Sequence, residues 1–162
     1  MCISEILKII GAVLITLILG LVQVTFTSIA IKGVVPNLVL VLVFGITFLE
    51  LKGKSKLSWR SYTSAIGGGL LLDVFSSLPF GTEALMLLVV ILVLEQVFKF
   101  LDKINFLIYS ILFVLIAVVY QLVFNLISFG ILKFNWILMV YNLSLAFLFY
   151  LLCFLGAILK EK

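Results

Sequence analysis

Long runs without a charged side chain divide this chain, and they constrain its fold more than any other feature. The first run, from Ile9 to Ile31, has 23 positions, and a helix needs about 20 apolar residues to cross a bilayer. Of the 162 residues, 65% are hydrophobic and only 11% are charged, whereas soluble domains have about 25% charged residues. A globular core could not enclose this much apolar surface, so we expect an integral membrane protein.

Six apolar segments can be placed along the chain. They predict a single all-α membrane domain over residues 1–162, folded as a six-transmembrane-helix bundle. The segments cover about residues 9–31, 33–49, 61–78, 80–98, 104–132 and 134–159. In the second segment, Pro36 fits the first turn of a helix. The third and fourth segments could instead form a re-entrant hairpin, because only Ser61 to Leu72 is free of charge before Asp73.

The basic residues are distributed unevenly between the two sides of the predicted membrane. With six spans, nine Lys and Arg residues fall on the side that holds both termini, and only Lys32 and Lys133 fall on the other. Cytoplasmic loops of membrane proteins carry the excess of Lys and Arg. We therefore expect cytoplasmic N- and C-termini, with the turn at residues 76–80 facing outside.

Several function classes are disfavoured by what the chain lacks. It contains no histidine, which is the commonest general base and metal ligand. Cys2 and Cys153 lie at opposite ends without metal-site or redox spacing. The glycines at positions 67–69 are not followed by the Lys and Ser/Thr of a phosphate loop. The basic residues separate apolar runs and do not form a nucleic-acid patch. We expect no enzyme activity, no cofactor, no metal and no nucleic-acid partner.

The stretch from Ser61 to Leu85 is the most distinctive part of the chain. Read as a helix, Ala65, Gly69 and Asp73 share one face with Ser77. Small residues let helices approach closely in a membrane, and an acid there costs about 2.5–3.5 kcal/mol at the helix centre on insertion scales. This face therefore predicts a packed or functional surface. The alternative is that the glycines only pack the helix and that Asp73 only caps or bonds a neighbour.

A turn follows this helix and leads into the next apolar run. Pro79 and Gly81 predict the end of one helix and the start of another, and Glu83 opens the fourth segment. With six spans, Asp73 and Glu83 flank this turn on the outer side.

Most other polar side chains inside the predicted spans also lie toward the outer side. Gln121 and Asn125 are four residues apart, so they share a helix face. The remaining amides of this set are Gln23, Asn37, Asn135 and Asn142. Each amide could join two helices, which is worth about 0.6 kcal/mol on average, or together they could line an outward-facing polar cavity or a docking groove. On the inner side, Glu95 can pair with Lys99 at i+4.

These residues resemble the family of the rod shape-determining protein MreD. The resemblance lies in Pro36-Asn37 at the start of the second span, Gly69-Leu70-Leu71-Leu72-Asp73, and the stretch from Pro79 to Leu85. It implies a bundle similar to the substrate-binding subunits of energy-coupling-factor transporters. It also implies a non-enzymatic scaffold subunit in the plasma membrane of a bacterial cell. This subunit would bind MreC, and through it MreB, RodA and a class B penicillin-binding protein, in support of peptidoglycan synthesis and cell shape.

The similarity of fold leaves a transporter alternative open, namely a vitamin-binding or other small-molecule-binding subunit of an energy-coupling-factor transporter. A purely structural or chaperone-like membrane protein is a third class. Within the first reading, we expect Asp73 to anchor a partner helix or loop. Inside the chain, the nearest groups that could bond this carboxylate are Lys32, Lys133, Gln121 and Asn125.

Overall fold

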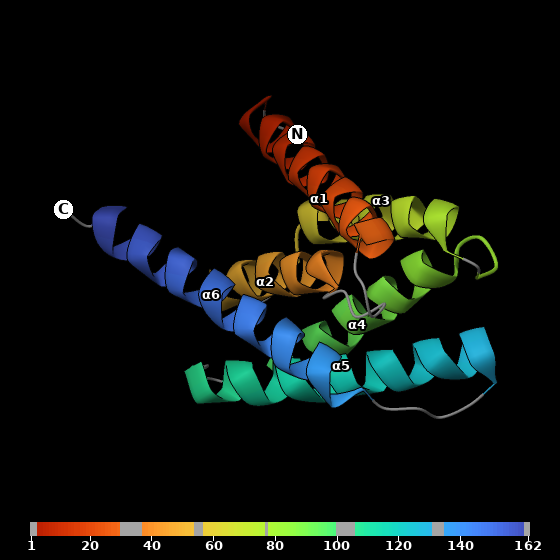
Figure 1. Cartoon of the computed structure of the whole chain (residues 1–162). Helices are drawn as coiled ribbons and strands as arrows, with labels where there is room; N and C mark the ends of the chain where they lie inside the picture. The colour runs from red at the N-terminus through yellow and green to blue at the C-terminus, as the bar shows by residue number, and fades with distance from the viewer. Residues whose placement is uncertain are drawn as a thin grey trace.

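The protein is described by a computed structural model over residues 3–29, 37–53, 57–76, 78–99, 106–130 and 135–160. These residues form helices and turns without any strand, which confirms the all-helical prediction (Figure 1). Each of the six predicted apolar segments contains one helix. The helices are α1 (Ile3–Ile29), α2 (Leu38–Gly53), α3 (Trp59–Phe75), α4 (Thr82–Lys99), α5 (Phe106–Phe129) and α6 (Trp136–Lys160).

Several helix boundaries differ from the prediction, and two of these differences have a local cause. The second helix begins at Leu38, because the Asn37 side chain caps it by accepting the N–H of Leu40 at 2.8 Å. Pro36 lies outside the described residues and precedes this helix. The fifth helix ends at Phe129, since Gly130 follows with a φ of +66° and donates its N–H to the carbonyl of Leu126 at 2.9 Å. A glycine in this left-handed conformation commonly ends a helix.

Successive helices run in opposite directions, so the bundle has two distinct ends. We call them the Ser58 end, where α3 begins, and the Pro79 end, where α3 turns into α4. At the Ser58 end, Glu5 of α1 contacts the start of α3, and α2 and α4 finish there. At the Pro79 end, α1, α3 and α5 finish while α2, α4 and α6 begin (Figure 1).

Helix α2 occupies the centre of the bundle. It packs against α1, α3, α4 and α6, and its residues from Val39 to Phe44 are all buried. A helix that is apolar on every side is stable only when it is buried in the core or in a membrane. Aromatic rings fasten the last two helices to it: Phe48 of α2 lies 4.4 Å from Tyr109 of α5 and 6.3 Å from Tyr150 of α6, measured between ring centroids.

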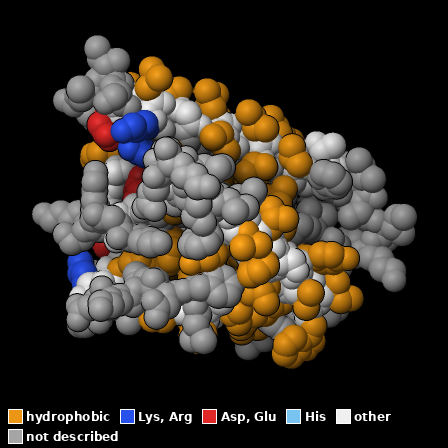
Figure 2. Space-filling view, turned by 90° about the vertical axis from the view of Figure 1, so that its left-hand side faces the viewer, with side chains coloured by type: hydrophobic (Ala, Val, Ile, Leu, Met, Phe, Trp, Pro, Cys, Tyr) orange, Lys and Arg blue, Asp and Glu red, His pale blue; other side chains and the backbone are white. Residues whose placement is uncertain are grey.

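The outer surface of the bundle is largely apolar. Two stretches of the described residues, Glu5–Thr25 and Ile108–Ser128, are long and apolar enough to cross a membrane, and Leu38–Leu51 and Trp136–Leu148 are shorter apolar helices. Figure 2 looks at the Ser58 end and shows the described charged side chains gathered at the left of the view, with mostly hydrophobic side chains over the rest of the described surface. Both features fit the predicted membrane location.

Candidate functional site

The glycines of α3 allow three helices to converge on it. A Cβ atom added to Gly69 would lie 2.3 Å from the Cα and 2.5 Å from the N of Ala84, so the backbones of α3 and α4 are in contact. Gly68 faces in another direction, where an added Cβ would lie 2.6 Å from methyl groups of Thr16 in α1 and Val39 in α2. The close contact predicted at Gly69 is therefore present, and Ala65 on the same face is fully buried.

The carboxylate of Asp73 caps the beginning of α4 across the turn. It accepts the N–H groups of Gly81 at 3.0 Å, Glu83 at 2.8 Å and Ala84 at 3.4 Å. The first N–H groups of a helix have no partner within the helix, and a negative charge is favourable at that end. Gly81 has a φ of +94°, a conformation that glycine adopts without strain. This geometry makes Asp73 part of a clamp on α4, as the alternative interpretation of the sequence held.

The docking role that we expected for Asp73 has no support in its contacts. The carboxylate is only 4% exposed, and in the described part of the chain its hydrogen bonds are those to the start of α4. Neither Gln121 nor Asn125 bonds to it there, and Lys32 and Lys133 lie outside the described residues. Asp73 is therefore directed into its own hairpin, because the turn between α3 and α4 brings the unpaired N–H groups of α4 directly over it.

Glu83 joins α4 to α5. Its side chain is also 4% exposed, and the Tyr120 hydroxyl donates a hydrogen bond to its Oε2. The Asn37 side chain lies beside the same hydroxyl, so α2, α4 and α5 meet here. Tyr120 was not singled out from the sequence, because an aromatic residue in an apolar run has packing or lipid contact as its ordinary role. Its position next to Gln121 was the only available signal.

The amides predicted near the outer side are mostly helix caps. Gln23 accepts the N–H of Val39 at 3.2 Å, and Asn142 accepts the N–H of Asn37 at 2.7 Å, so both serve the start of α2. Asn135 accepts N–H groups at the start of α6, from residue 137 at 3.1 Å and residue 138 at 3.3 Å. Gln121 donates to the Asn135 carbonyl at 3.5 Å.

These contacts explain why polar side chains gather at the Pro79 end. Helices α2, α4 and α6 all begin there, and each start presents unpaired N–H groups that an apolar environment cannot satisfy. Of the predicted set, Asn125 is half-buried. The described polar side chains at the Pro79 end cap helix starts and connect helices. This agrees better with the interpretation that the amides join helices than with an open polar cavity.

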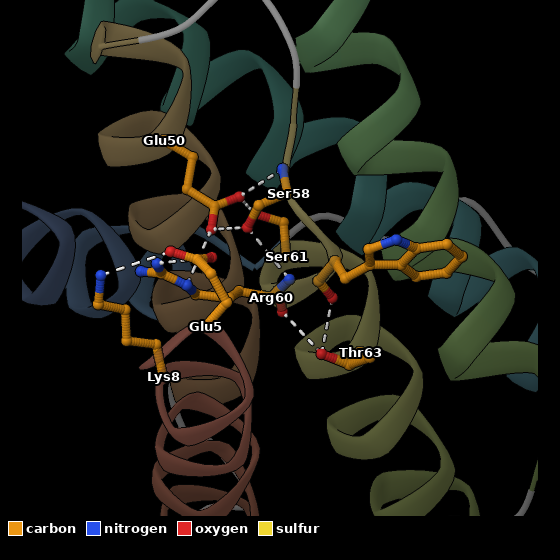
Figure 3. Close-up of polar contacts among 8 residues, drawn as sticks. Glu5, Lys8, Glu50, Ser58, Arg60, Ser61 and Thr63 are labelled. Atoms are coloured by element: carbon orange, nitrogen blue, oxygen red, sulfur yellow. Dashed lines mark hydrogen bonds and ion pairs between the residues drawn. The ribbon is translucent and has the colours of Figure 1, made fainter. Parts of the chain in front are cut away.

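A second polar cluster, at the Ser58 end, was not predicted as a site (Figure 3). Glu50 of α2 accepts the N–H of Ser58 at 3.1 Å and the hydroxyl of Ser61 at 2.7 Å, and it also accepts the Ser58 hydroxyl. Arg60 of α3 lies between Glu50, at 3.9 Å, and Glu5 of α1, at 3.5 Å. From the sequence, the basic residues of this region were expected only to determine the orientation in the membrane.

The same end carries the one ion pair that the sequence predicted. Lys99 lies 4.0 Å from Glu95 at i+4, and the Tyr62 hydroxyl donates to Glu95 at 2.9 Å. Arg60 with its two acids, and Tyr62 with Glu95, thus link the start of α3 to α1, α2 and α4. Helix α3 is held at both ends by polar contacts and along its length by glycines.

Most of the described polar side chains at the two ends take part in helix caps or in contacts between helices. The described residues contain no group of three side chains suited to hold a metal ion. Cavities of about 390 and 530 Å³ flank the line where α5 meets α6; Ser110 and Leu143 line both, and their walls are mostly apolar. Comparison with known protein families, with characterised proteins and with solved structures found no match for this chain.

Proposed function

We propose that this protein is a non-enzymatic scaffold subunit of a bacterial cell-elongation complex, a member of the MreD family. The observation that carries the proposal is the α3–α4 clamp. Gly69, Asp73, Gly81 and Ala84, which carry the resemblance in the sequence, meet at one place: Gly69 against the backbone of Ala84, and Asp73 on the N–H groups of Gly81 and Ala84. The residues that carry the resemblance thus form one structural unit.

In this proposal the six-helix bundle is embedded in the plasma membrane, with the Ser58 end in the cytoplasm. The alternating helix directions and the excess of Lys and Arg at the Ser58 end support this orientation. It places both termini in the cytoplasm and the Pro79 end toward the outside. Trp59 at the start of α3 and Trp136 at the start of α6 are highly exposed, as aromatic residues of the two membrane–water interfaces are.

A protein partner fits the described polar groups better than a polar ligand does. The side chains that were candidates for a ligand cavity bond to helix starts, and the large exposed area of the bundle is apolar. The partner in this proposal is MreC, and through it MreB, RodA and a class B penicillin-binding protein. Specificity for such partners would come from the shape of the helix faces rather than from buried charges.

One observation favours the transporter alternative. The two open, mostly apolar grooves beside α5 and α6, about 390 and 530 Å³, are similar in volume to small-molecule sites, which measure roughly 300–1,000 Å³. A vitamin-binding subunit of an energy-coupling-factor transporter would bind its ligand in such a space. Stabilisation of the purified protein by a vitamin, measured as a rise in melting temperature in detergent, would support this alternative.

The scaffold proposal is tested by co-purification. The full chain, tagged and solubilised from the membrane, should retain the single-span coiled-coil protein encoded beside its gene, while an unrelated six-span membrane protein with the same tag should not. Depletion of the chain from a rod-shaped cell should produce round cells. Absence of both effects, together with a vitamin-induced rise in melting temperature, would replace the scaffold with the transporter.

A further inference from the structure

We propose that the tip of the α3–α4 hairpin, described by residues 74–76 and 78–82, is immersed in the lipid of the outer leaflet and does not project into water. This assignment rests on the proposed membrane location and adds lipid as the partner of this surface. It also bears on the question left open by the sequence, namely whether α3 and α4 fully cross the bilayer.

The surface of the tip is apolar and aromatic. Phe80 at the turn is 72% exposed, and Val74 and Phe75 at the end of α3 are 65% and 58% exposed. No charged residue lies between Asp73 and Glu83 in the sequence, and both of these acids are buried. A turn in water usually carries polar or charged residues at such positions, whereas exposed Phe and Val side chains are favourable in contact with lipid.

Most of the described N–H groups of the tip are bonded within the hairpin. Besides the three N–H groups bound by Asp73, the N–H of Ser76 bonds to the Asp73 carbonyl at 3.3 Å and that of Leu78 bonds to the Ser76 hydroxyl at 3.3 Å. The N–H and the hydroxyl of Thr82 both bond to the Pro79 carbonyl, at 3.1 and 2.6 Å. Pro79 has no N–H, so among the described residues of the turn only Phe80 keeps an N–H without an acceptor.

The bonding of these N–H groups is compatible with lipid as the surrounding medium. A turn in water can leave its N–H groups to the solvent, but in the hydrocarbon region each unsatisfied group costs several kcal/mol, so irregular backbone is tolerated there only when it is satisfied by the protein. The Asp73 carboxylate, set back beneath the tip, supplies the acceptors that water would supply elsewhere. The clamp therefore serves the same purpose as the apolar surface.

Helix length gives an independent reason. Helix α3 has 17 residues, which at 1.5 Å per residue gives about 25 Å, less than the roughly 30 Å of hydrocarbon in a bilayer. Its first residue, Trp59, is 70% exposed, and such aromatics mark the interface. A helix that starts at the inner interface and ends after about 25 Å places its last turn, with Val74 and Phe75, within the hydrocarbon of the outer leaflet.

Fluorescence quenching of single-tryptophan variants tests the position of the tip. Phe80→Trp is made in a chain that also carries Trp59→Phe and Trp136→Phe, and the full chain is reconstituted into phosphatidylcholine vesicles. We expect blue-shifted emission, strong quenching by lipids brominated on the acyl chain, and loss of most of the iodide quenching seen with N-acetyl-tryptophanamide in solution. Val74→Trp in the same background should behave alike, and it guards against an effect of the substitution at the turn itself.

The opposite pattern would overturn the assignment. If iodide quenches Phe80→Trp and Val74→Trp as it does the soluble reference, the tip lies in water; protection that appears only on adding the coiled-coil partner would make the tip a protein-docking surface. Leu85→Trp on the exposed side of α4 is the matched control, since it should contact lipid in either case. Iodide quenching at this control position would show that the bundle is not embedded, and would overturn the proposed membrane scaffold as well.

Discussion

Replacing Gly69 with alanine should force α3 and α4 apart. The added methyl carbon would start 2.3 Å from the Ala84 Cα, and ordinary contact begins near 3.4 Å, so the helices must separate by about 1 Å. Ala84 presents backbone atoms at this point, which cannot rotate away as a flexible side chain could. Because Asp73 holds α4 through N–H groups of the same turn, the separation also lengthens those hydrogen bonds.

The expected cost follows from these contacts. Overpacking of a close contact costs about 1–3 kcal/mol, and weakening the cap adds up to about 1 kcal/mol, while the change from glycine to alanine in a helix returns about 1 kcal/mol. Gly67→Ala is a matched control in the same helix, since its added carbon would meet only a Val13 methyl group at an ordinary 3.7 Å. The gain in helix propensity is the same for both variants. The difference between their free energies of unfolding therefore reports the cost of overpacking together with that of the weakened cap.

The measurement is the unfolding free energy of both variants in the same detergent micelles, or their melting temperatures where unfolding is irreversible. We expect Gly69→Ala to be less stable than Gly67→Ala by about 1–4 kcal/mol, with Gly67→Ala at or above the stability of the parent protein. Equal stabilities of the two variants would refute the backbone contact between α3 and α4.

Three further predictions concern the polar contacts, and a fourth concerns the orientation in the membrane. Asp73→Ala should lower the free energy of unfolding by about 2 kcal/mol by leaving the start of α4 without its acceptor, and Asp73→Asn should lower it by less because one oxygen remains. Binding of the partner in a pull-down should weaken in proportion to the loss of stability. A weaker pull-down by a variant of unchanged stability would support the docking role. Tyr120→Phe should cost about 1–3 kcal/mol because Glu83 loses its donor, whereas Tyr141→Phe on the exposed side of α6 should be neutral; equal melting temperatures would contradict the contact. Glu50→Ala should cost more than about 1 kcal/mol by freeing Ser58, Ser61 and Arg60, while Lys99→Ala breaks an exposed pair worth about 0.5 kcal/mol. Reporter domains fused to either terminus should both be active only in the cytoplasm, and an external signal from one of them would reverse the proposed orientation.

The class of the fold, the number of helices and the position of the α3–α4 turn were all determined by the sequence alone. These properties depend on local patterns: the length of an apolar run, the charges that separate runs, and the Pro79 and Gly81 that interrupt one of them. The face shared by Ala65, Gly69 and Asp73 also follows from the helical period, as does the i+4 spacing of Glu95 and Lys99. Each of these features can be read from one continuous segment of the chain.

Only the tertiary structure decided what each face meets. Helices α1 and α2 are both long apolar segments, yet α2 is enclosed by its neighbours while much of α1 is exposed, because a helix that is apolar on every side carries no signal for its direction of burial. The partners of Asp73, Glu50 and Tyr120 lie 8 to 37 residues away, beyond any periodic pattern. These partners depend on where the helices begin, because the unpaired N–H groups of a helix start that is shielded from water need side-chain acceptors. The packing of the helices, close where glycines lie between them, decides which side chains are near enough to accept.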